Sequence, residues 1–249
     1  MTALARSTPL LLHDIHADVW PAHALSRAAL PVLATGEAAL DAQLPGGGWP
    51  IGALTEILQP PGVHSEWRLL LPALARSGLG PVLLVGAPHL PFAPALAAQG
   101  MAATRLLWVQ AEAPAARLWA SEQALRCAEV SAVLAWLPQA RSEQLRRLQM
   151  AAAEYSKLLF VMRPASAQDE ASPAALRLFV RPQTQTPAQP VGRSATPTPT
   201  AVDALQVQLL KRRGPPLAQP LQLTARSSHL NLLLASSQAH ALDCPAARA

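Results

Sequence analysis

The chain has 249 residues, of which 51% are hydrophobic and 14% charged, and its formal net charge is +5. This length fits one core domain of ordinary size plus extensions, and the mild positive charge suits either nucleic acid or an acidic protein partner. The most apolar run, Leu79–Ala87, has about half of the ~20 residues that cross a bilayer, so we expect no membrane span.

Residues 1–30 are predicted to form an N-terminal helical arm, with a short amphipathic helix at roughly Leu10–Trp20. Its apolar stretch is interrupted by four polar residues, which is not typical of a secretion signal. We interpret these residues as the polar side of the helix rather than as ligands, so no metal site is predicted. They are His13, Asp14, His16 and Asp18.

Short apolar runs then alternate with longer helical patterns over residues 31–224, which is typical of an α/β domain. We predict a mostly parallel, twisted sheet flanked by helices. The expected strands are Ala53–Leu58, Pro81–Gly86, Arg105–Gln110, Ala132–Leu137 and Lys157–Met162, and the expected helices are Glu66–Arg76, Pro114–Ala128 and Ser142–Tyr155.

The pattern changes after Met162, because three further strands follow without helices between them. These are Leu176–Arg181, Ala204–Lys211 and Leu217–Thr224, which predict antiparallel strands at the C-terminal edge of the sheet. Residues 182–201 are rich in Pro, Thr and Gln, so a flexible surface loop is expected at Pro182–Ala201. Residues 225–249 are predicted to be a C-terminal tail.

Several sequence blocks, in order, resemble known proteins. From Leu33 the chain reads LATGEAALDAQLPGGGWPIGALTEILQPPG, which resembles the start of the RecA recombinase core. Within that RecA- and SulA-like superfamily, five blocks resemble the ImuA family. They are LPGGGWPIGALTEIL, APHLPFAPALAAQG, EQALR followed by VLAWLP, SPAALRL, and LLKRRG. The resemblance covers roughly Pro31 to Thr224 and implies a RecA-like core.

The segment that matches a phosphate-binding loop lacks the groups that such a loop needs. Gln59 and His64 stand at its two glycine positions, and only Gly62 between them is glycine. Ser65 replaces the lysine that neutralises phosphate oxygens, and Glu66 replaces the magnesium-binding hydroxyl. We therefore predict a degenerate loop with no nucleotide cofactor.

The other catalytic positions of the family are also altered. Ala87 stands where the resemblance places the acidic residue that activates water, and Ala135 or Trp136 where it places the magnesium-directing aspartate. Losing all of these groups removes the electrostatic stabilisation that nucleotide hydrolysis requires. The sequence predicts that the protein is not an enzyme.

Two groups of cations are candidates for contacts with a partner or with DNA. Lys211, Arg212 and Arg213 close a strand at a turn, where such charges can also simply protect a sheet edge. Arg146 and Arg147 flank the apolar stripe of a predicted helix, where a solvated face is the plainer interpretation. The loops that grip DNA in RecA hold few cations here, so any DNA contact is expected to be weak.

The resemblance to ImuA implies an accessory role in an SOS-induced complex for translesion DNA synthesis. Its implied partners are the Y-family-related protein ImuB, RecA itself, and, through ImuB, an error-prone replicative-type polymerase. The alternative is a SulA-like inhibitor that binds the tubulin-like cell-division protein, although SulA lacks the Pro/Thr-rich loop and the KRRG turn. The two cysteines, Cys127 and Cys244, have neither a metal-ligand spacing nor a disulfide framework, which favours the reducing cytoplasm.

Overall fold

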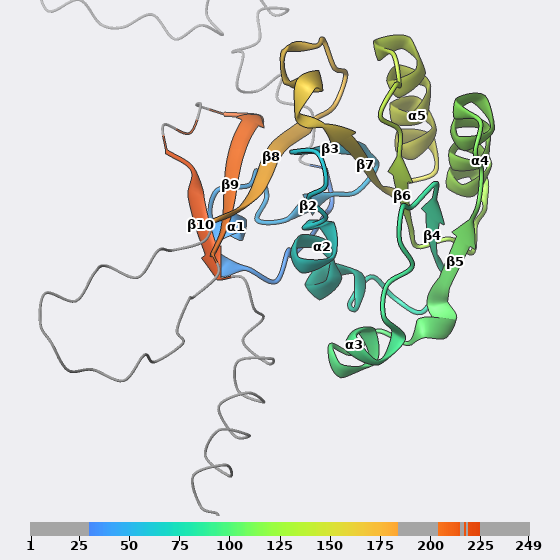
Figure 1. Cartoon of the computed structure of the whole chain (residues 1–249), viewed down its shortest axis with the longest axis horizontal. Coiled ribbons are helices and arrows are strands. Elements are labelled where there is room, and N and C mark those ends of the chain that lie inside the picture. The colour runs from blue at the N-terminus through green and yellow to red at the C-terminus, as the bar shows by residue number, and fades with distance from the viewer. Residues whose placement is uncertain (1–29, 184–203, 215–216, 218, 225–249) are drawn as a thin grey trace, which may run out of the picture. The chain divides into compact units, whose positions relative to one another are not determined.

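The computed structural model describes residues 30–183, 204–214, 217 and 219–224 (Figure 1). The predicted N-terminal helix at Leu10–Trp20, the tail at 225–249 and the predicted loop beyond Gln183 lie outside these residues. Within the described part of the chain, no helix is both long and apolar enough to cross a membrane.

An eight-stranded sheet forms the centre of the fold, and its mostly parallel arrangement confirms the predicted α/β class. The strand order is β10-β9-β8-β3-β7-β6-β4-β5, and the strands from β5 to β8 in this order are parallel. The antiparallel strands β9 and β10 extend the sheet beyond β8, as predicted. The bounds are β3 Ala53–Gln59, β4 Val82–Val85, β5 Leu106–Val109, β6 Ala132–Trp136, β7 Leu158–Pro164, β8 Leu176–Gln183, β9 Ala204–Lys211 and β10 Leu221–Thr224.

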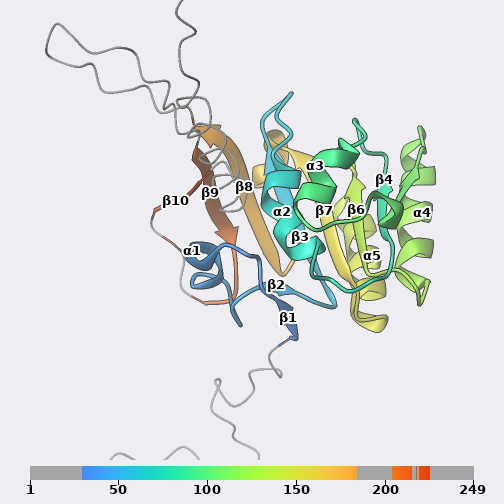
Figure 2. The ribbon, with the colours of Figure 1, turned by 90° about the horizontal axis from the view of Figure 1, so that it is seen from below.

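Helices cover both faces of this sheet (Figure 2). One buried cluster packs side chains of α1, α2 and α3 against one face, and a second packs α4 and α5 against the other. Because both faces are buried, the central strands are apolar runs rather than alternating ones. The helices are α1 Ala38–Asp41, α2 Glu66–Leu74, α3 Ala93–Ala98, α4 Pro114–Arg126 and α5 Ser142–Glu154, with short 3-10 turns η2 Ala103–Arg105 and η3 Ala165–Asp169.

The segment that precedes β3 folds back on α2, and the sequence patterns did not predict its elements. Strands β1 (Val32–Leu33) and β2 (Trp49–Pro50) pair as a small antiparallel sheet on either side of α1. Gly36 adopts a φ of +92°, and a Cβ there would lie 2.6 Å from the Cβ of Pro72 in α2. Only glycine fits both the conformation and the contact. The Thr35 amide donates to Asp41 Oδ1 at 2.7 Å, which closes the turn into α1.

Two predicted boundaries in the C-terminal part are wrong. Pro182 and Gln183, assigned to the flexible loop, belong to β8 and pair with Leu205 and Ala204 of β9. The last strand begins at Leu221 rather than Leu217, directly after Pro220. Proline has no N–H to donate to a strand ladder, so Pro220 is a natural place for the strand to start.

Candidate functional site

The segment Gln59–Glu66 connects the end of β3 to the start of α2, the strand–loop–helix setting of a phosphate loop. Its backbone is a tight turn, in which the Val63 amide donates to the Pro60 carbonyl at 3.2 Å and Gly62 has a φ of +73°. Pro60 and Pro61 have no N–H, and the N–H of Val63 is used inside the turn. Three of the loop's backbone positions therefore offer no N–H to an anion.

Glu66 places a carboxylate at the position where a phosphate-binding helix receives its anion. The residue is 2% exposed, and its Oε2 has no hydrogen-bond partner among the described residues. The Nδ1 of His64 lies 3.7 Å from Glu66 Oε1, and the His64 ring meets the His89 ring edge-on at 4.9 Å. The positive end of the α2 dipole favours this carboxylate, which in turn repels a second negative group.

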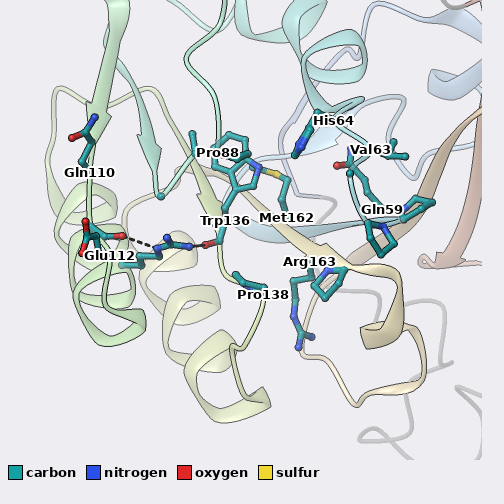
Figure 3. Close-up of a pocket in the computed structure, with 18 of the residues that line it drawn as sticks. Gln59, Val63, His64, Pro88, Gln110, Glu112, Trp136, Pro138, Met162 and Arg163 are labelled. Atoms are coloured by element: carbon teal, nitrogen blue, oxygen red, sulfur yellow. Dashed lines mark hydrogen bonds between the residues drawn. The ribbon is translucent and has the colours of Figure 1, made fainter.

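A pocket of about 520 Å³ opens beside this loop, at the carboxyl ends of five neighbouring strands (Figure 3). This is the place where open α/β sheets bind their ligands, and the volume suits a small molecule or a short peptide segment. Of the five positions named as the degenerate loop, three line the pocket, whereas Ser65 and Glu66 belong to the start of α2. Those three are Gln59, Gly62 and His64.

The floor of the pocket comes from three adjacent strands. Gln59 ends β3, Met162 lies in β7, and Trp136 ends β6 opposite Met162 in the strand register. Alternation along each strand places these three side chains on the face of the sheet that α2 covers. Figure 3 shows Trp136 and Met162 together, with His64 across from them. Ala87, which follows β4, is buried and also lines the pocket.

The two cations that border the pocket already have partners. Arg117 donates from Nε to the Ala111 carbonyl at 2.7 Å and from Nη1 to the Trp136 carbonyl at 3.3 Å. Arg163 donates to Glu170 at 2.6 Å and to Glu56 at 2.9 Å, and in Figure 3 its guanidinium points away from His64 and Met162. Neither cation is positioned as a phosphate lysine would be.

Arg163 belongs to a buried ion network that the sequence analysis did not detect. Glu56 is fully buried in β3 and accepts from Arg163 of β7 and, at 2.6 Å, from Arg177 of β8. Arg177 also donates to the carbonyls of Ala167 and Gln168 in η3. Burial acts against the charge of Arg163, but its hydrogen bonds and charge interactions with Glu170 and Glu56 raise the pKa of its guanidinium above the usual value.

The basic turn Lys211–Arg213 makes more hydrogen bonds to the rest of the fold than its sequence suggested. Lys211 Nζ donates to the Ser172 carbonyl at 2.9 Å, and the half-buried Arg212 donates to the Gln43 carbonyl of the segment before β2. Both side chains therefore connect β9 to other parts of the fold, and Arg213 is exposed at this turn, as is Lys211. Changing all three residues together would confuse binding with folding.

The two helical candidates also differ from each other. Arg147 Nη2 lies 2.6 Å from Glu122 Oε2, and Glu122 Oε1 also accepts from Arg126, so this cluster joins α5 to α4. Arg146 is exposed on α5. The structure does not bring these arginines to the pocket or to the basic turn. Exposed ion pairs of this kind contribute little stability.

The sequence analysis missed most of the pocket lining, namely Met162, Arg163, Arg117 and Trp108. The sequence did carry a signal for the ion network, because Glu56, Arg163 and Arg177 are charged residues inside otherwise apolar strand runs. The runs are ALTEILQ, LLFVMRP and LRLFVRP. Of the tryptophans in the described residues, Trp49 and Trp136 are buried, whereas Trp108 and Trp119 are exposed. Within the described residues, no group of three His, Cys, Asp or Glu is arranged to hold a metal ion.

No protein-family model matches this sequence, and a search of the curated proteins finds no match either.

Proposed function

We propose that this chain is a non-catalytic, RecA-like accessory protein of an SOS-induced translesion synthesis complex of the ImuA type. It acts in the cytoplasm by binding other proteins, with ImuB and RecA as the direct partners and an error-prone polymerase reached through ImuB. The alternative is a SulA-like protein that binds the tubulin-like division protein. The two proposals differ in the partner that the chain should capture.

The loop between β3 and α2 is the observation that carries the proposal. A nucleotide needs a lysine at this place, and the chain has Ser65 there instead, preceded by two prolines that have no N–H and followed by the buried carboxylate of Glu66. A β- or γ-phosphate beside Glu66 would meet a like charge in a poorly solvated setting, where repulsion is strong. A domain of this shape without its nucleotide chemistry keeps surfaces that can bind proteins.

We expect no useful affinity for ATP, because the groups at Gln59, His64, Ser65 and Glu66 cannot neutralise or cradle its phosphates. Titration calorimetry with ATP and magnesium should give a Kd weaker than about 1 mM, equivalent to roughly 4 kcal/mol of binding free energy. An active RecA-type ATPase measured in the same buffer is the positive control. Micromolar binding, or any turnover above background, would show that the site is functional.

Affinity capture with purified proteins tests the partners. The full-length chain should retain ImuB and RecA and should not retain the division protein, and Arg213→Ala should weaken that capture while changing stability by no more than about 0.5 kcal/mol. Arg126→Ala on α4 is the matched control, because it also removes one partly exposed arginine. Capture of the division protein alone would favour the SulA-like alternative.

The same variants test for DNA binding. If Arg213 or Arg146 contacts phosphate, each alanine variant should flatten the salt dependence of DNA affinity by about one unit of slope. If the salt dependence of DNA affinity is unchanged in both variants, Arg213 and Arg146 do not contact DNA phosphates.

A further inference from the structure

The lining of the pocket combines proline rings and tryptophans with few charges. Trp108 lines the pocket and is 39% exposed, and Trp136 is buried in the floor of the pocket beside Met162. Such a surface offers flat apolar contacts to a ligand of similar character. The prolines are Pro60, Pro61, Pro88, Pro138 and Pro164.

Three residues of this lining carry a buried N–H without a partner among the described residues, namely Gln59, Trp136 and Arg163. The guanidinium of Arg163 points away from His64 and Met162 in Figure 3, so the two donors on the pocket side are those of Gln59 and Trp136. Neither Gln59 Nε2 nor Trp136 Nε1 has a hydrogen bond within the described part of the chain, and both residues are less than 10% exposed. Buried polar atoms are nearly always hydrogen-bonded, so a pair of unpartnered donors in one pocket indicates a ligand that brings acceptors. In Figure 3 the nitrogen-bearing edge of Trp136 faces Met162 and His64 rather than the interior of the sheet.

The charges around the pocket indicate that these acceptors are neutral. Glu66 is buried next to His64, and the nearby Arg117 and Arg163 already donate to other groups of the protein. An anionic ligand would find no cation here that lacks a partner and would lie close to the buried carboxylate of Glu66. Amide carbonyl oxygens are neutral acceptors that fit Gln59 and Trp136 without this conflict.

We propose that this pocket binds a proline-rich segment of a partner protein in the extended polyproline II conformation. The backbone carbonyls of such a segment have no internal hydrogen bonds and are free to accept from Gln59 and Trp136. Its proline residues bring no N–H groups that would need acceptors, and its rings pack on the prolines and on Trp108. The inference rests on the proposed function, since it names the kind of segment that a binding protein of this type holds.

The test is a titration of the full-length chain with synthetic decaproline, followed by the indole N–H signals in a nitrogen–proton NMR spectrum. The sequence has six tryptophans, and Trp136→Phe and Trp108→Phe identify two of the signals. The Trp136 signal should shift as its N–H gains an acceptor, with a smaller shift for Trp108. The signal of Trp119, which lies outside this pocket, should stay in place. A Gly/Ser decapeptide should move none of them.

Variants of the two donors measure their part in binding. Gln59→Met keeps the shape of the side chain without its amide, and Trp136→Phe keeps an aromatic ring without its N–H. Each should weaken decaproline binding about fivefold, the loss expected for one hydrogen bond. Trp119→Phe is the matched control and should bind as wild type does. Equal affinities in all three variants, equal binding of the Gly/Ser peptide, or no indole shift at millimolar decaproline would overturn the proposal.

The outcome is separable from that of the proposed function. If the chain captures ImuB and RecA but does not bind decaproline, the proposed function is kept and the proposal for this pocket is rejected. If the chain binds decaproline but captures neither partner, the proposal for this pocket is kept and the proposed function is rejected.

Discussion

Replacing Glu56 with glutamine should lower the free energy of unfolding by about 3–5 kcal/mol, because it leaves two buried guanidinium groups without their shared carboxylate. Arg163 and Arg177 both donate to Glu56, whose side chain is fully buried. Arg163 would keep Glu170, whose side chain is 55% exposed, and Arg177 would keep two carbonyls of η3. Urea titration of both proteins, analysed with a common m-value, gives the difference.

Two controls separate the loss of charge from the loss of packing. Glu154→Gln removes an exposed carboxylate at the end of α5 and should change stability by less than about 0.5 kcal/mol. The triple change Glu56→Leu, Arg163→Met and Arg177→Met removes all three charges and should recover most of the loss, because apolar residues of similar volume replace buried ion pairs well. A loss below about 1 kcal/mol for Glu56→Gln would mean that water or other groups compensate the arginines.

Phe160→Ala should cost a similar amount, about 3–5 kcal/mol, because it removes a large side chain from the middle of the sheet. Phe160 is 1% exposed in β7, and its ring meets the ring of Trp49 edge-on, with centroids 5.5 Å apart and an interplanar angle of 89°. The contact joins β2 to the main sheet, so both the cavity and the lost aromatic pair contribute. The difference in unfolding free energy from urea titration is again the measurement.

Phe92→Ala is the matched control for this change. Phe92 is 72% exposed before α3, so the same truncation removes no buried surface and should leave stability within about 0.5 kcal/mol of wild type. If both phenylalanine variants had the same stability, the packing of β2 on β7 would not contribute to folding as described.

The ion network and the pocket lie on opposite faces of the same strand ends. Arg163 follows Met162 in β7, so one side chain reaches the Glu56 network while its neighbour forms the pocket floor. Because alternate side chains of a strand point to opposite faces, the network can hold β3, β7 and β8 in register without occupying the pocket. The stability experiment on Glu56 and the binding experiment on Gln59 therefore test different faces of one structure.

The sequence by itself determined the class of fold and most of the elements. Runs such as VLLV and AVLAW are apolar because the strands are buried on both faces, and the absence of helices between the last three strands predicted their antiparallel pairing. Residue identity alone also shows that the segment between β3 and α2 has Ser65 and Glu66 where a phosphate loop has a lysine and a hydroxyl.

Only the tertiary structure decided which side chains meet. The register of β3 against β7 and β8 places Glu56 between two arginines more than 100 positions away, which no local pattern encodes. The turn at Lys211–Arg213 looks like a free basic tip in sequence, yet Lys211 and Arg212 reach carbonyls of distant segments. Gln59 and Trp136 become two donors of one pocket because β7 alone separates their strands, and strand order is set by packing of the whole sheet rather than by any single segment.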